Sequence, residues 1–278
     1  MNSKLAFCMD NASQATHVNL SPEQIDYFSE NGYLILAQFF SPEEIKRLSS
    51  IADHLQAKAE ELSKKQTGKV LHLGTQFVID KINAKTQIHR IVWAGAAEHE
   101  LLNLARQPKL LIPVAQLLDS DTADHLINQL HYKLPQDGVD FAWHQDIKNR
   151  RTFDPNWKDI NGKGSFVQVI IAIDAMKIEN GTIFFVPQSH KSGDLFLDKI
   201  ADEKELARIA HLDLAVPYLL EPGDVLFMHP YLVHGSFANN STEPRRIFIN
   251  GFSYPGANTG IYPGEGSSQR IRLREPVK

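Results

Sequence analysis

The first third of the chain shows the apolar spacing of amphipathic helices, and two of them have the same start signal. Ser21 and Ser41 are each followed by Pro-Glu and then by Gln24 or Glu44 three residues on. This pattern predicts an N-terminal capping box with proline in the first helical position. The first helix should end near Asn31-Gly32. The second continues with apolar residues at helical spacing, at Ile45, Leu48, Ile51 and Leu55.

Short apolar runs separated by turn dipeptides dominate the remainder of the chain, after a first short strand at 33–36 and apart from one helical stretch at 98–118. Strands are expected at 76–79, 89–93, 127–134, 166–173, 182–186, 224–228 and 246–253. Helices that precede many short strands favour a mainly β protein with flanking helices. We expect a flexible N-terminal lead over residues 1–18 and a single domain over residues 19–278.

Composition narrows the function classes. The chain has 278 residues, of which 42% are apolar, and its net charge of -4 gives no reason to expect nucleic acid as a partner. Cys8 is the only cysteine, so an intramolecular disulfide is excluded. We find no signal peptide and no apolar run long enough for a membrane span. These features favour a cytoplasmic protein. We expect a monomer or a homodimer, and the sequence does not decide between them.

The strongest chemical signal is the segment His144-Gln145-Asp146. On an extended strand, residues i and i+2 point to the same side, so an imidazole and a carboxylate would converge on one point. A second histidine from elsewhere would complete three ligands on one face of an octahedron. That is the facial triad of non-haem Fe(II) oxygenases, in which the open positions bind cosubstrate and oxygen.

The motif His-x-Asp occurs twice, at His144/Asp146 and at His211/Asp213, so a third ligand has to decide between them. His234 lies between two strand-like runs. The 90 positions from His144 to His234 can hold the intervening strands of a double-stranded β-helix, whereas the 23 positions from His211 cannot. His211 also falls in a helix-like run at 206–214. We therefore predict that His144, Asp146 and His234 hold the metal.

Arg245 follows His234 by 11 residues and can return to the same pocket if the chain turns through residues 239–243. A guanidinium donates two parallel hydrogen bonds to a carboxylate. Ser236 shares the face of His234 and could donate its hydroxyl to the same carboxylate. The adjacent Arg246 should point to the other face and cannot share this role.

In this order, the motifs resemble those of the phytanoyl-CoA dioxygenase family, which includes ectoine hydroxylases, over residues 20–254. The blocks that carry the resemblance are Ser-Pro-Glu-Gln at 21–24, Trp-His-Gln-Asp at 143–146, Glu-Asn-Gly at 179–181, Val-Pro-Gln-Ser-His-Lys at 186–191, Pro-Gly-Asp at 222–224 and His-Gly-Ser at 234–236. One departure is Gln188, where the family more often has glycine.

The resemblance implies a double-stranded β-helix, which is a cupin-like jelly-roll core. It implies Fe(II) on His144, Asp146 and His234, with 2-oxoglutarate and O2 as cosubstrates. It also implies that Arg245, Ser236 and Gln129 bind 2-oxoglutarate. His190 is given a structural role. The implied reaction is hydroxylation of a C–H bond with release of succinate and CO2, and the carboxylate of Asp146 disfavours halogenation.

The sequence does not identify the substrate. The polar and basic segment 147–164 follows the metal ligands and either borders the substrate mouth, where arginines would meet an anionic or zwitterionic small molecule, or forms a solvated loop. Residues 194–211 are a second candidate lid, and Trp143 and Trp157 either line the pocket or pack. Desaturation, cyclisation and epimerisation on the same scaffold remain alternatives, as does a non-catalytic metal-binding β-barrel.

Overall fold

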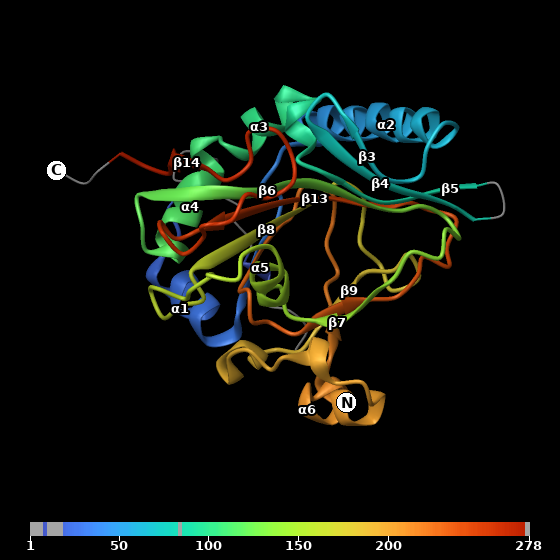
Figure 1. Cartoon of the computed structure of the whole chain (residues 1–278). Coiled ribbons are helices and arrows are strands. Elements are labelled where there is room, and N and C mark those ends of the chain that lie inside the picture. The colour runs from blue at the N-terminus through green and yellow to red at the C-terminus, as the bar shows by residue number, and fades with distance from the viewer. Residues whose placement is uncertain (1–7, 10–18, 83–84, 276–278) are drawn as a thin grey trace.

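Two β-sheets of unequal size face each other, and helices cover the outer face of the larger sheet (Figure 1). This computed structural model describes residues 8–9, 19–82 and 85–275. Most of the expected lead therefore lies outside the described residues; Cys8–Met9 form β1, which pairs in parallel with β2. Within these ranges, no helix combines the length and the apolar character needed to cross a lipid bilayer.

The larger sheet has ten strands in the order β1-β2-β11-β8-β13-β6-β5-β4-β3, and β14 pairs with β6. Apart from β1, its strands are β2 (Tyr33–Leu36), β3 (Gly68–His72), β4 (Thr75–Ile82), β5 (Lys85–Val92), β6 (Thr122–Lys133), β8 (Phe166–Ala172), β11 (Val225–Met228), β13 (Arg245–Ser253) and β14 (Gln269–Arg272). The smaller sheet runs β10-β9-β12-β7. Its strands are β7 (Phe141–His144), β9 (Ile183–Phe185), β10 (Val216–Pro217) and β12 (His234–Ser236).

Both faces of the larger sheet are buried. On β8, Val169 and Ile171 pack toward the helices, whereas Ile170 and Ala172 pack toward the smaller sheet. This is why these strands read as continuous apolar runs instead of alternating apolar and polar positions. The seven strands expected from such runs are all present, and the predicted mainly β fold with flanking helices is confirmed.

Both predicted helix starts are confirmed. The Ser21 and Ser41 hydroxyls accept hydrogen bonds from the backbone of Gln24 and Glu44, whose side chains accept from the serine N–H groups in return. The first helix ends at Gly32, which has a φ of 81°. The six α-helices of the described residues are α1 (Pro22–Asn31), α2 (Pro42–Ser63), α3 (His99–Ala105), α4 (Pro108–Leu118), α5 (Ile147–Phe153) and α6 (Glu203–Ile209).

Two segments differ from expectation. The single helix expected over 98–118 is broken into α3 and α4, because Pro108 disfavours helical backbone at the residue before it and starts a new helix. Segment 147–164 is not one loop, since its first seven residues form α5. Gln188 adopts a left-handed backbone with a φ of 63°, which explains why a glycine suits this turn.

Candidate active site

His144 and His234 lie opposite each other on adjacent strands of the smaller sheet. His144 is the last residue of β7, His234 is the first residue of β12, and their Cα atoms are register partners. The two ring centroids are 4.2 Å apart. Strand pairing, which no local sequence pattern specifies, thus brings together two histidines that lie far apart along the chain.

Asp146 completes the cluster from a different local structure than expected. It is not on the strand: β7 ends at His144, and Asp146 is the helical residue that caps α5, with φ -62° and ψ -21°. Its carboxylate oxygens lie 3.7 Å from His144 Nε2 and 3.9 Å from His234 Nε2. One ligand atom from each of the three residues lies within 4.8 Å of the other two. The predicted convergence is present, although its geometric premise was wrong for the carboxylate.

The hydrogen bonds of the two imidazoles leave Nε2 free to bind a metal. His144 Nδ1 lies 2.7 Å from the carbonyl oxygen of Ala142, and His234 Nδ1 lies 2.9 Å from that of Leu232. A carbonyl oxygen can only accept a hydrogen bond, so Nδ1 carries the proton of the neutral ring and the free lone pair is on Nε2. Burial, followed by the neighbouring His234, lowers the pKa of His144 and favours this neutral form.

Asp146 Oδ2 is buried and has no hydrogen-bond partner in the described part of the chain. A buried carboxylate oxygen is costly unless a cation or a donor satisfies it. Two imidazole nitrogens and one carboxylate are a suitable donor set for a first-row divalent ion such as Fe(II). The residues present therefore fit the metal that the motif predicts.

Gln145 positions the junction between β7 and α5, a role that the sequence did not reveal. Its Nε2 donates to the carbonyl oxygens of Gly193 and Tyr231, at 2.8 and 2.6 Å, and its Oε1 accepts from the N–H of Leu195 at 2.8 Å. The side chain is only 3% exposed. Because Gln145 separates the two ligands, these bonds hold both His144 and Asp146 in place.

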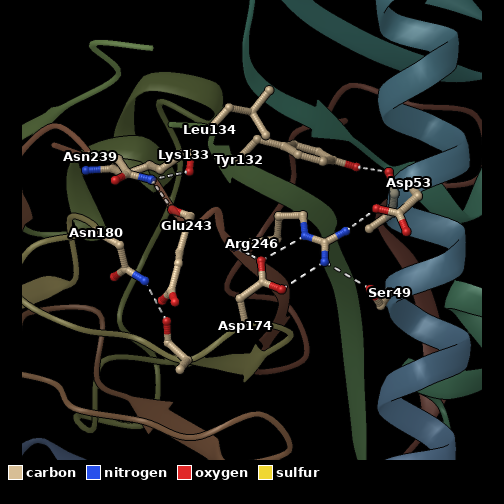
Figure 2. Close-up of polar contacts among 12 residues, drawn as sticks. Ser49, Asp53, Tyr132, Lys133, Leu134, Asp174, Asn180, Asn239, Glu243 and Arg246 are labelled. Carbon is tan, nitrogen blue, oxygen red and sulfur yellow. Dashed lines mark hydrogen bonds and ion pairs between the residues drawn. The ribbon is translucent and has the colours of Figure 1, made fainter. Parts of the chain in front are cut away.

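Arg245 lies on the inner face of the larger sheet and is 1% exposed. Its Nη2 donates to the carbonyl oxygen of Gly181 at 2.9 Å, whereas its Nε has no partner among the described residues. Burial lowers its pKa to about 10, so the guanidinium stays charged at neutral pH. Arg246 points to the opposite face, as predicted, where it bonds to Asp174, Asp53 and Ser49 (Figure 2).

The expected turn between β12 and β13 is stabilised by Asn239. Its Nδ2 donates to the carbonyl oxygens of Lys133 and Glu243, at 2.9 and 2.7 Å (Figure 2). Its Oδ1 accepts from the N–H of Ser241 at 2.9 Å. The turn returns the chain as β13, antiparallel to β6, with Arg245 opposite Lys133.

A cavity of about 330 Å³ between the two sheets contains the three candidate metal ligands, Arg245 and Ser236. Its size lies within the range of roughly 300–1,000 Å³ that is usual for small-molecule sites. Gln129 lines it, and so does His131, a residue that sequence reasoning missed. Strand register explains both, because Gln129, His131 and Lys133 alternate along β6 opposite Ile249, Ile247 and Arg245.

The remaining candidate residues from the sequence differ in whether they line this cavity. Trp143 lines it, whereas Trp157 packs on Phe166 with ring centroids 6.4 Å apart. From α5 and its flank, Lys148, Asn149, Arg150 and Phe153 line the cavity. No residue of 194–211, all of which the structure describes, lines it.

The two other histidines discussed in the sequence, His190 and His211, do not belong to the cluster. His190 is buried, with Nε2 2.9 Å from the carbonyl oxygen of Ser29. His211 is exposed, directly before a 3-10 helix (Leu212–Leu214).

Comparisons with known proteins agree with this geometry. Residues 28–247 match the model of the family described as phytanoyl-CoA dioxygenase (PhyH). The chain is 28% identical to methylphosphonate hydroxylase of Gimesia maris over 231 residues, which are 83% of this chain and 79% of the relative.

Two solved structures share the fold. The crystal structure of EctD from S. alaskensis with 2-oxoglutarate and 5-hydroxyectoine has a TM-score of 0.71 and 21% identity, covering 95% of this chain and 90% of that one. The non-heme alpha ketoglutarate dependent carbocyclase SnoK has a TM-score of 0.65 and 18% identity, covering 92% and 98%.

These structures confirm the expected double-stranded β-helix, or jelly roll, formed by the two facing sheets. The family model spans most of the chain, including both sequence segments of the histidine and aspartate cluster. The chain therefore belongs to the phytanoyl-CoA dioxygenase family and is an Fe(II)- and 2-oxoglutarate-dependent dioxygenase.

Proposed function

We propose that the enzyme hydroxylates a C–H bond of a small-molecule substrate, with conversion of 2-oxoglutarate and O2 to succinate and CO2. One observation carries the proposal: a cluster of two histidines and one carboxylate shares a cavity with a buried guanidinium, and one carboxylate oxygen of the cluster has no hydrogen-bond partner among the described residues. The small size of that cavity supports a small-molecule substrate.

His144, Asp146 and His234 would hold the iron, which together with the keto acid supplies the oxidising power for attack on a C–H bond. The chain's own residues prepare this chemistry. The carbonyl oxygens of Ala142 and Leu232 keep the imidazoles in the tautomer that binds metal. A carboxylate at Asp146 occupies a ligand position that a halogenase would leave to chloride, which supports oxygenation over halogenation.

Arg245 is proposed to bind the distal carboxylate of 2-oxoglutarate, with Ser236 and Gln129 as further contacts. The Nε of Arg245, which no described residue bonds, is available for a carboxylate oxygen, and the buried site strengthens such a charge-assisted bond. Ser236 follows the ligand His234 by two residues on β12, so its hydroxyl lies on the metal side of the strand.

Cyclisation and epimerisation remain the second candidate, because the carbocyclase SnoK has the same fold. Hydroxylation and these alternatives all start with removal of hydrogen from the substrate and diverge in the later steps. Product mass distinguishes them: hydroxylation adds one oxygen atom, whereas epimerisation leaves the mass unchanged and ring closure by loss of two hydrogens lowers it.

The decisive experiment measures succinate formed from 2-oxoglutarate and Fe(II) in air, without a prime substrate. We expect slow turnover in the wild type and none in the Asp146→Ala or His234→Ala variant. The Asp213→Ala variant is the matched control, since it alters the other His-x-Asp motif and should retain turnover. Wild-type turnover in either triad variant would refute the proposed ligands.

A further inference from the structure

Arg150 is a buried cation that forms no ion pair within the described part of the chain, although the charge of the candidate metal ligand Asp146 acts on it. It lies on α5, one helical turn after Asp146, and is 2% exposed. Its Nε and Nη1 atoms are enclosed and make no hydrogen bond, and it forms no ion pair with any described residue. Buried charges are normally paired or bound to a ligand, because an isolated one loses its hydration without compensation.

Two aromatic rings hold the Arg150 guanidinium in place at the cavity wall. Its central carbon lies 4.5 Å from the ring centroid of Phe166 and 4.8 Å from that of Tyr262. Such cation–π contacts orient a guanidinium but leave its N–H donors free. Arg150 and Tyr262 both line the cavity that contains the metal cluster.

The cavity as a whole has an excess of positive charge. Among the described residues, five cationic side chains line it, whereas Asp146 is the only carboxylate there and belongs to the proposed metal site. Fe(II) and the 2-oxoglutarate dianion cancel each other in charge, so binding both leaves the excess unchanged. The five cations are Lys69, Arg90, Lys148, Arg150 and Arg245.

Arg245 and Phe166, the ring that contacts Arg150, lie toward different ends of the larger sheet. Phe166, which contacts Arg150, is the register partner of Ser253 on β13, eight residues from Arg245. At about 3.3 Å per residue, these positions are roughly 26 Å apart along the strand. A carboxylate bound by Arg245 is therefore too far away to pair with Arg150 as well. Pairing of the Arg150 guanidinium requires a second anion.

We propose that the prime substrate carries an oxyanion, either a phosphonate or a carboxylate, that pairs with Arg150. This proposal rests on the proposed function and specifies the substrate class for the same cavity. A guanidinium suits both groups, since its N–H donors match oxyanion geometry and it stays charged when buried. Arg150 would thus position the substrate beside the metal cluster through its charged end.

The test uses the full chain loaded with Mn(II) in place of Fe(II) and saturated with 2-oxoglutarate, which occupies the Arg245 site. The probes are methylphosphonate, butyrate and the neutral ester dimethyl methylphosphonate. Paramagnetic relaxation of their ³¹P or ¹³C nuclei reports binding near the metal without any catalysis. We expect relaxation with one or both anions, and none with the neutral ester; the stronger anion identifies the headgroup.

Variants assign the binding to Arg150. We expect Arg150→Met to weaken anion binding about tenfold or more, which corresponds to loss of one charge-assisted contact. Arg150→Lys should retain part of the affinity because the charge remains. The matched control is Arg208→Met, which removes an exposed arginine on α6 outside the cavity and should leave binding unchanged.

Thermal unfolding adds a second measurement. An oxyanion should raise the Tm of the wild type and leave that of Arg150→Met unchanged. If the protein binds Mn(II) and 2-oxoglutarate but neither anion, or if Arg150→Met binds the anion like the wild type, the substrate proposal is overturned and the proposed function stands. Failure to bind Mn(II) and 2-oxoglutarate at all would instead overturn the proposed function.

Discussion

Arg245 and Arg246 are neighbours on β13, yet their guanidinium groups lie on opposite faces of the larger sheet. Arg245 shares its face with Ile247 and Ile249, which pack toward the smaller sheet. The Arg246 guanidinium extends toward α2 and donates hydrogen bonds to Asp53 and Ser49 of that helix. It also donates to Asp174 (Figure 2). The strand period of two thus places a cation that lines the cavity next to one that bonds to Asp174, Asp53 and Ser49 on the other face.

The first prediction follows from this pair. Arg245→Met should raise the 2-oxoglutarate concentration required for half-maximal succinate formation by roughly 30-fold, because a buried charge-assisted contact contributes about 2 kcal/mol. The affinity for iron should stay unchanged, since Arg245 is not a ligand. Succinate formation and metal titration measure the two quantities separately.

Arg246→Met is the control for this prediction. It should leave the requirement for 2-oxoglutarate unchanged and lower the free energy of unfolding by about 1–3 kcal/mol, since Asp174 loses both hydrogen bonds from the guanidinium and keeps the one from the backbone N–H of residue 246. An equal rise in the requirements for iron and 2-oxoglutarate in Arg245→Met would show that its carboxylate role is wrong.

The second prediction concerns the turn that delivers Arg245 to the cavity. Asn239 is fully buried, and its replacement by alanine removes the hydrogen bonds that Nδ2 donates to the carbonyl oxygens of Lys133 and Glu243. We expect Asn239→Ala to destabilise the fold by about 1–3 kcal/mol and to weaken 2-oxoglutarate binding. Urea unfolding and succinate kinetics provide the measurements.

Asn156→Ala is the matched control for the turn. Asn156 is exposed, and its side chain makes no hydrogen bond in the described part of the chain. We expect the free energy of unfolding of Asn156→Ala to lie within about 0.5 kcal/mol of the wild-type value. If Asn239→Ala lowered the free energy of unfolding no more than Asn156→Ala does, the turn would not depend on the Asn239 side chain.

The third prediction is a pH dependence of 2-oxoglutarate binding. Burial, followed by the charge of Arg245, lowers the pKa of Lys133 to about 7. A carboxylate bound to Arg245 offsets that repulsion and raises the pKa of Lys133, so binding takes up a proton. The affinity for 2-oxoglutarate should therefore decrease as the pH rises above about 7. The decrease should stop once the pH exceeds the pKa that Lys133 has in the complex.

Calorimetry in two buffers of different ionisation enthalpy measures this proton uptake directly in the wild type. Lys133→Met should abolish the uptake and flatten the pH dependence in the same range. An affinity that increases with pH, or a wild type that releases protons on binding, would contradict the role of Lys133.

Local patterns in the sequence predicted much of this protein. The capping boxes at Ser21 and Ser41 are encoded within four residues, and so are the apolar strands, which is why both could be found without a structure. The ligand residues could be proposed because their chemistry and spacing restrict the choice, and the family resemblance strengthened them. The break at Pro108 was also encoded locally, and it should have been recognised from the proline.

Tertiary structure decided what depends on contacts between distant segments. The pairing of His144 with His234 is a strand register between β7 and β12, and the role of His131 follows from its place opposite Ile247 on β13. That Arg150 forms no ion pair with any described residue could not be read from the basic segment that contains it. Residue type determines which interactions a side chain can make, but burial and partners arise only when the chain is folded, because both depend on residues far apart in the sequence.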